Sequence, residues 1–302
     1  MAVEGEGFGE GPYGLVPFGG VLLPGLHVAP FVDAPCPRVG ITLTGLDATG
    51  PSRVTLYRST AGGQRRIVRG WDNRLVYGSE YSIDYEAPLG REVVYTLEVI
   101  SGSVIPPMLL DTTFLDVPTG FIQDPLLPLG AIGLASGLEV DQMPVLTDSV
   151  FRKLQYDIEA SSVKIMGSRE PVAMTGQRMV ASGIDFSVFT EAAEHATALR
   201  NLLMEGGIVL VRPLPSWGPL PDLLYTVPSV SEEPVYAQDG VMFTRWTMSG
   251  DSVRPPSVDI LVALWTYNQV AALWTTYASA QDAANAAGYR YLDVQRDPTM
   301  GA

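Results

Sequence analysis

The stretch at 54–101 constrains the fold more than any other part of this chain, because its residues alternate as those of paired β-strands do. An apolar-polar alternation begins at Val54, reaches an Ala-Gly-Gly turn at 61–63, and is followed by a returning segment at 66–69. A second pair of strands is expected on either side of the turn at 88–90. The pattern predicts antiparallel β-structure joined by tight turns.

The same alternation starts earlier, at Val39, Ile41 and Leu43, so the predicted β-structure extends over residues 39–104. Several short strands separated by turn signals fit a β-sandwich of the fibronectin type III kind. Tyr95 is either a packing or corner residue of such a sandwich or an ordinary cross-strand aromatic.

Two segments rich in proline flank this sandwich. Residues 1–38 also contain many glycines and show no sustained period, so they cannot bury their own apolar side chains. We expect them to form an extended arm that packs on another domain or on a neighbouring subunit. Residues 105–149 predict a connector with one or two short strands. The candidate interface residues of the N-terminal arm are Phe8, Tyr13, Phe18 and Leu22.

Strand signals resume in residues 150–256, where the alternation around Ile184 predicts a sheet with one apolar face. A helix is expected at 190–205, with Thr190 as its N-cap and Gly206-Gly207 at its end. This region is predicted to be a β-domain covered by one helix.

The C-terminal segment 257–302 is predicted to contain a second helix at 257–287. Its apolar run is shorter than the roughly 20 residues needed to cross a membrane, and Asn268 and Gln269 interrupt it. We therefore expect no membrane anchor. Large apolar side chains on such a helix indicate docking on its own domain or on a neighbouring subunit. The candidates are Leu261, Trp265 and Trp274.

The balance of charges argues against tight nucleic-acid binding. The chain has a net charge of -14, and its 19 basic residues are scattered, whereas binding to a phosphate backbone needs clustered Lys and Arg. The only cysteine, Cys36, cannot form an intramolecular disulfide, and the segment 1–10 does not resemble a secretory signal. We expect synthesis in a reducing cytosol.

No combination of side chains predicts catalysis, a cofactor or a transition metal. Cys36 lies between prolines, and His27 and His195 are far apart in the sequence. The sequence lacks a Gly-x-Ser-x-Gly elbow, an EF-hand loop and a phosphate loop. The 33 acidic residues leave a pair of glycosidase carboxylates open, because only geometry would select one. We expect a protein that is not an enzyme.

Several segments between Arg152 and Pro256 form a further pattern. They are Ser168-Arg169-Glu170-Pro171-Val172, Ser182-Gly183-Ile184-Asp185-Phe186, the helix with Leu199 and Leu202-Leu203, and Gly206-Gly207 to Val211-Arg212-Pro213. Together they resemble minor tail proteins of long-tailed bacteriophages of actinobacteria, specifically those related to the distal tail protein. The segment at 84–95 is similar to the sandwich found in the same proteins.

The resemblance implies a structural virion protein at the tail tip, mainly β, with a flanking helix on a β-sandwich like that of tail-tube proteins. Distal tail proteins form rings, usually hexameric, that join the tail tube to the baseplate hub. The implied partners are copies of the chain itself, the tail-tube protein, and the baseplate hub or a tail-associated protein. A ring requires a heterologous interface, and the segments 1–38 and 257–287 are natural candidates to reach across it.

Distal tail proteins place the ring domain first, whereas here the sandwich comes first. Two other functions stay open. One is a peripheral tail-tip protein whose sandwich binds host cell-wall glycan. Its stacking residues would be Trp71, Trp217 or Tyr236 if these are exposed, although core packing is the more frequent role of such side chains. The other is a tail-associated wall hydrolase, which a peptidoglycan-release assay would identify.

Overall fold

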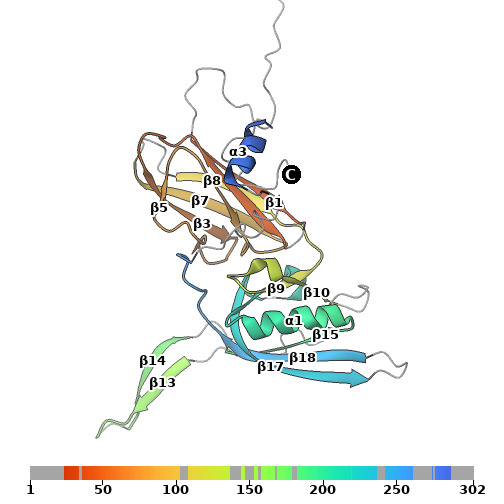
Figure 1. Cartoon of the computed structure of the whole chain (residues 1–302). Coiled ribbons are helices and arrows are strands. Elements are labelled where there is room, and N and C mark those ends of the chain that lie inside the picture. The colour runs from red at the N-terminus through yellow and green to blue at the C-terminus, as the bar shows by residue number, and fades with distance from the viewer. Residues whose placement is uncertain are drawn as a thin grey trace, which may run out of the picture.

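The chain is described by a computed structural model that covers residues 24–33, 36–102, 108–136, 144–146, 153–155, 158–166, 169–178, 182–218, 220–236, 242–260, 274 and 276–286. The fold is mainly β, as the sequence predicts. Two β-domains lie one above the other, and a narrow two-stranded hairpin extends from the lower one (Figure 1).

The upper domain is a sandwich of two sheets. One sheet has the order β1-β2-β6, and the other has the order β4-β3-β7-β8, with β5 also paired to β3. Inward side chains from both sheets form one core, in which Trp71 and Tyr95 are among the largest fully buried members. The strands are β1 (Gly25–Phe31), β2 (Arg38–Thr44), β3 (Ser52–Thr60), β4 (Arg66–Ile67), β5 (Arg74–Val76), β6 (Glu80–Asp84), β7 (Glu92–Ser101) and β8 (Met108–Phe114).

The sandwich is longer than the predicted range 39–104 at both ends. Strand β1 falls in the segment expected to be an extended arm, and β8 falls in the segment expected to be a connector. Pro30 lies opposite Val39 within β1, which is tolerated because β1 is an edge strand and a missing N–H costs little there. The expectation of an arm over all of 1–38 was therefore wrong for residues 25–31.

The lower domain is built on a sheet that closes on itself, and we call it the closed-sheet domain. The strand order is β11-β10-β9-β16-β17-β18-β15-β12, and β11 pairs with both β10 and β15. The core inside contains Phe186 and Trp246. The strands are β9 (Gly120–Gln123), β10 (Ile132–Ser136), β11 (Val145–Leu146), β12 (Lys153–Gln155), β15 (Ser182–Thr190), β16 (Val209–Arg212), β17 (Leu224–Tyr236) and β18 (Met242–Ser252).

The supposed connector 105–149 therefore contributes strands to both domains. Its prolines Pro118, Pro125 and Pro128 lie between strands and not within them, so they limit the length of the strands without preventing them. Short 3-10 helices occur at Pro128–Gly130 and, further along, at Pro215–Trp217.

Helix α1 (Ala193–Glu205) packs on the core of the closed-sheet domain through Leu199, Leu202 and Leu203. Its last residue is Glu205 and its C-cap is Gly206, as predicted, but it begins later than expected. Thr190 is not its N-cap, because Thr190 is the last residue of β15 and its hydroxyl accepts a hydrogen bond of 2.9 Å from Trp246 Nε1. The buried indole therefore holds Thr190 in the sheet.

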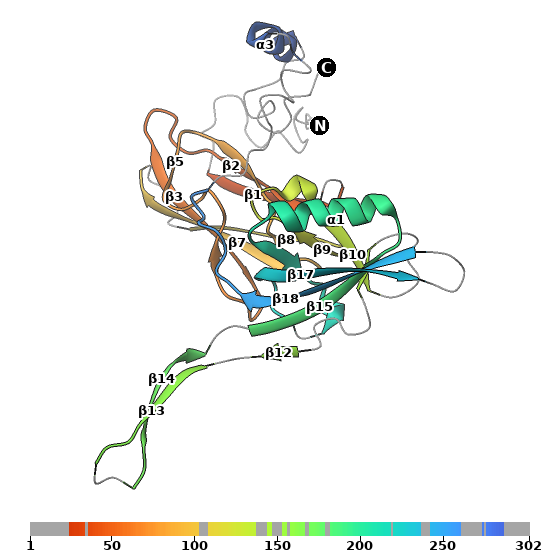
Figure 2. The ribbon, with the colours of Figure 1, turned by 60° about the horizontal axis from the view of Figure 1, so that its bottom comes forward.

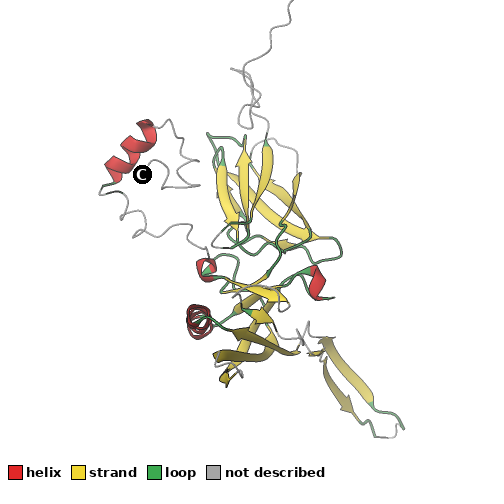
Figure 3. Cartoon of the chain, turned by 90° about the vertical axis from the view of Figure 1, so that its right-hand side faces the viewer, coloured by secondary structure: helices red, strands yellow, loops and turns green. Residues whose placement is uncertain are grey.

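The two-stranded hairpin consists of β13 (Ile158–Val163) and β14 (Val172–Arg178), and we call it the ribbon. It is a separate sheet, and it points away from both domains in all three views (Figure 1, Figure 2, Figure 3). From Ile158 to Gly176, every side chain whose exposure is described is exposed to solvent.

The C-terminal segment contains helix α3 (Tyr277–Ala286). Residues 257–260 form a turn, with a backbone hydrogen bond from Ile260 N to Ser257 O, so the predicted helix does not begin at 257. Asp259 accepts a hydrogen bond from the Ser257 hydroxyl and stabilises this turn. Residues 261–273 of the predicted helix lie outside the described residues.

Candidate functional site

The two domains meet at a junction fastened by Arg212, the last residue of β16. Its guanidinium is fully buried and donates to the carbonyl oxygen of Ala87 at 2.6 and 3.0 Å and to that of Pro37 at 2.8 Å. It also donates to Oε1 of Gln123 at 3.2 Å, and the amide of Gln123 donates to the carbonyl of Tyr85 at 3.0 Å. A strand of the closed-sheet domain thus ends inside the loops of the sandwich. Burial lowers the pKa of Arg212.

A group of buried polar side chains, which we call the junction cluster, lies behind this contact. Asp84 accepts hydrogen bonds from the guanidinium of Arg58 and, at 2.9 Å, from the hydroxyl of Tyr95. Glu86 accepts from Arg58 at 3.1 Å and from the hydroxyl of Tyr225 at 3.0 Å. Since Tyr225 belongs to β17 and the other members belong to the sandwich, the cluster joins the two domains. Its members are Arg58, Arg69, Asp84, Glu86, Tyr95 and Tyr225.

The charges of the junction cluster are balanced. Two guanidinium groups, Arg58 and Arg69, face the two carboxylates of Asp84 and Glu86. Burial acts to lower the pKa of Arg58, but Asp84 and other neighbours raise it well above its ordinary value. Burial, reinforced by Glu86, raises the pKa of Tyr225. The Tyr225 phenol therefore stays protonated and donates its hydrogen bond to the carboxylate of Glu86.

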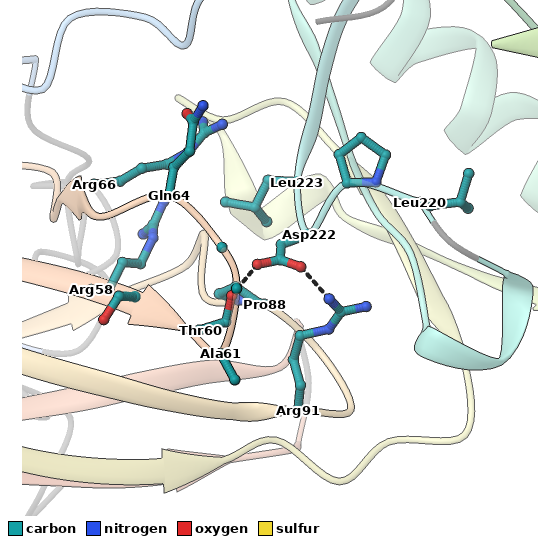
Figure 4. Close-up of a pocket in the computed structure, with 14 residues that line it drawn as sticks. Arg58, Thr60, Ala61, Gln64, Arg66, Pro88, Arg91, Leu220, Asp222 and Leu223 are labelled. Atoms are coloured by element: carbon teal, nitrogen blue, oxygen red, sulfur yellow. Dashed lines mark hydrogen bonds and ion pairs between the residues drawn. The ribbon is translucent and has the colours of Figure 1, made fainter.

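An open groove of about 420 Å³ lies beside the cluster, between the turn at 60–64 and the segment at 220–223 (Figure 4). Asp222 lies in this groove and accepts hydrogen bonds from Thr60 and Arg91, which both belong to the sandwich. A Cβ at Gly63 would lie 2.6 Å from an Asp222 carboxylate oxygen, so glycine is needed for this close approach. The groove therefore contains a second set of polar contacts between the two domains.

Arg66, which also lines the groove, lies over an aromatic ring. Its guanidinium carbon lies 5.8 Å from the centroid of the Tyr225 ring, which is within the range of a cation–π contact. Like Asp222, it links the sandwich to the closed-sheet domain. The arrangement of side chains around the groove is suited to holding two domains in one orientation.

The structure does not bring together the residues considered for nucleophilic chemistry. Cys36 is buried before β2, and burial raises the pKa of its thiol. His27 lies on β1 with its Nδ1 3.5 Å from Asp111. His195 is in α1, and its Nδ1 is buried with no hydrogen-bond partner among the described residues. His195 belongs to the closed-sheet domain, whereas His27 and Cys36 belong to the sandwich.

The aromatic residues considered for glycan stacking do not form a platform on the described surface. Trp71 is fully buried in the sandwich core, so it cannot stack on a sugar. Trp217 is half-buried and packs against the cores of both domains. Tyr236 lies at the end of β17, and its side chain is outside the described residues.

Of the candidate interface residues, Trp274 alone lies within the described part of the chain. Trp274 is half-buried and comes shortly before α3, not within it. The others, Phe8, Tyr13, Phe18, Leu22, Leu261 and Trp265, lie outside the described residues.

The ribbon presents an apolar face that the sequence did not single out. Val163 lies directly opposite Val172, and Met174 lies opposite Ser161, so these side chains share one side of the ribbon. The exposed fractions are 47% for Val163, 48% for Val172 and 63% for Met174. Ile165, two residues beyond Val163, is 54% exposed. The sequence signal for this face was an apolar residue at every second position before the turn, at Val163 and Ile165, and after it, at Val172 and Met174.

The opposite side of the ribbon is small and polar. It carries Ala160 and Ser162 on β13, which pair with Thr175 and Ala173 on β14. The ribbon is therefore amphipathic, although both of its faces are in contact with solvent. An exposed apolar face of this kind indicates a surface for association.

Within the described ranges, no group of three or more His, Cys, Asp and Glu side chains is placed to hold a metal ion. No helix in the described part of the chain has both the length and the apolar character needed to cross a membrane. Comparison of the chain with protein-family models, with curated protein sequences and with solved structures gives no match.

Proposed function

We propose that this protein is a structural component of the tail tip of a long-tailed bacteriophage, where its copies form a ring between the tail tube and the baseplate hub. The observation that carries the proposal is the ribbon, which extends into solvent with an apolar face of Val163, Val172 and Met174. A two-stranded hairpin is at best marginally stable alone in water. Its apolar face gains stability by packing against a neighbouring protein.

The architecture supports the same function. A sandwich beside a β-domain with one packed helix is the arrangement that the resemblance to distal tail proteins implies. The fibronectin type III-like nature of the sandwich and the tail-ring nature of the closed-sheet domain are parts of this proposal. Arg212 and the junction cluster hold the two domains as one body, and such rigidity suits a subunit whose function is to set the geometry of an assembly.

Glycan binding by the sandwich has less support. Trp71 is a core residue and Trp217 is half-buried between two cores. The proposed ring is therefore favoured over a peripheral glycan-binding protein.

Native mass spectrometry tests the proposal directly. The purified protein is measured alone and after mixing with the tail-tube and hub proteins, and immunogold electron microscopy locates it on virions. A closed ring of copies and labelling at the tail tip are expected. A persistent monomer that binds wall glycan, or one that releases peptidoglycan fragments, would contradict the structural function.

A further inference from the structure

We propose that the ribbon of one copy docks on the outer face of strand β8 in a second copy of this chain. The inference deepens the proposed function and rests on it, since a ring of identical subunits needs two different surfaces that fit each other. The two surfaces are the apolar face of the ribbon and three side chains of β8, Met108, Leu110 and Phe114, which we call the β8 stripe.

The β8 stripe is exposed and apolar. Met108, Leu110 and Phe114 are separated by even numbers of positions in β8 and therefore lie on the same face of the strand, where the exposed Thr112 stands between Leu110 and Phe114. They are 49%, 56% and 47% exposed, whereas Thr113, which points to the other face, is buried. The stripe thus lies on the outside of the sandwich, where contact with another protein would remove it from water.

The ribbon of a molecule cannot reach the stripe of the same molecule. The ribbon leaves the closed-sheet domain on the side away from the sandwich, and the three views agree on this placement (Figure 1, Figure 2, Figure 3). Contact between these surfaces therefore has to join two copies. Such a contact is heterologous, and its repetition gives a closed ring or an open filament.

The two surfaces match in length. Strands β8 and β14 each have 7 residues, which corresponds to about 20 Å of extended chain. One face of the ribbon is therefore long enough to cover the whole stripe.

The charges around the two surfaces are complementary. Residues 158–178 contain Lys164, Arg169 and Arg178 but only Glu159 and Glu170, so the ribbon is net basic in a chain whose net charge is -14. The end of the stripe is acidic, because Glu92 lies opposite Phe114 on β7 and Asp116 follows two residues later, and both are exposed. Opposite charges at the rim of a contact favour this pairing.

Charge also argues against the pairing of two ribbons with each other. Lys164 and Arg169 lie between the two strands of the ribbon with only Glu170 to offset them, so the tip carries a net positive charge. Packing of two ribbons tip to tip would bring these cations of both copies together, which costs energy. A second copy's β8 stripe is therefore the better partner.

Disulfide cross-linking between two variants, each with one introduced cysteine beside the native Cys36, tests the proposal. Met174→Cys places a thiol on the apolar face of the ribbon, and Leu110→Cys places one in the middle of the β8 stripe. Both positions are more than half exposed, so the folded structure tolerates the changes, and the native Cys36 is buried. The two full-length variants are mixed, alone and with the tail-tube and hub proteins, and oxidised with copper phenanthroline.

We expect the mixture to give at least several times more cross-linked dimer than either variant alone. Thr175→Cys is the matched control for the ribbon, because Thr175 is exposed, adjacent to Met174 and on the opposite face. Cross-linking of Thr175→Cys with Leu110→Cys should be much weaker. Mass spectrometry of the dimer identifies which two cysteines are joined.

The outcomes separate this inference from the proposed function. Dimers of Met174→Cys with itself would show pairing between ribbons and overturn the proposal. A ring seen by native mass spectrometry without the mixed cross-link would overturn it while the tail-tip function stands. A mixed cross-link in a protein that is not found at the tail tip would support the contact and contradict the tail-tip function. The absence of any cross-link, alone or with partners, overturns the proposed contact.

Discussion

Replacing Asp84 by Asn should destabilise the protein by about 3–5 kcal/mol, although the side chain keeps its shape. Asp84 is buried and accepts hydrogen bonds from Arg58, from the Tyr95 hydroxyl and from the backbone N–H of Glu86. With Asp84 present, two guanidinium groups face two carboxylates in the junction cluster. With Asn in its place, Arg58 and Arg69 share only Glu86, so one buried positive charge has no counterpart.

A double-mutant cycle tests whether this charge causes the loss. Arg58→Met removes the buried cation, and the double variant of Arg58→Met and Asp84→Asn leaves the pair of Arg69 and Glu86 balanced. We expect the double variant to lose at least about 1 kcal/mol less than the sum of the two single variants. Unfolding in urea, followed by circular dichroism, gives the free energies of unfolding for the four proteins.

Asp72→Asn is the matched control, because Asp72 is an exposed aspartate of the same domain. It should change the free energy of unfolding by less than about 0.5 kcal/mol. The reasoning would be refuted if Asp84→Asn cost less than about 1 kcal/mol, or if the effects of the two single substitutions simply added.

Three further predictions concern the junction and the buried Cys36 of the sandwich. Stability should fall as the pH rises above about 10, because burial raises the pKa of Tyr95 and Tyr225 and the folded state therefore keeps protons that the unfolded chain has lost. The urea midpoint should fall less steeply with pH in Tyr225→Phe than in the wild type, and equal slopes would argue against this origin. Asp222→Ala should lower the free energy of unfolding by about 1–2 kcal/mol, because Asp222 is bound by two donors of the sandwich; a thermal melt identical to that of the wild type would count against it. The Cys36 thiol should react with a disulfide reagent only after urea unfolds the protein, since it is buried and burial raises its pKa; rapid reaction at neutral pH without urea would be the opposite result.

Strands with a clear alternation were predictable because the pattern is local. Val39, Ile41 and Leu43 are buried as expected in β2, and the alternation around Ile184 becomes β15 with Ile184, Phe186 and Val188 inside. Strand β1 was missed, and only one or two short strands were expected between 105 and 149, where β8, β9, β10 and β11 form; prolines obscured the pattern in both segments. Proline is compatible with strand ends and sheet edges, and the sequence does not show which strand will be an edge.

The contacts of the junction could not be predicted, because they join residues that are distant along the chain. Arg212 and Ala87 are 125 positions apart, and Tyr225 and Glu86 are 139 apart. The one local signal was an arginine at the end of the apolar run at 208–211, where a charge is costly unless it is paired or fully hydrogen-bonded. The exposure of the ribbon could not be predicted either, since alternating apolar residues usually indicate a buried face.

The hydrogen bonds of Arg212 that join the two domains also influence the size of the proposed assembly. The ribbon extends from the closed-sheet domain, and the β8 stripe lies on the sandwich. The junction between the two domains therefore fixes the angle between the two contact surfaces. If copies join head to tail through these surfaces, that angle sets the curvature added by each copy, and the curvature determines how many copies complete a circle. A substitution at the junction would then change the diameter of the circle while leaving the contact between neighbouring copies intact.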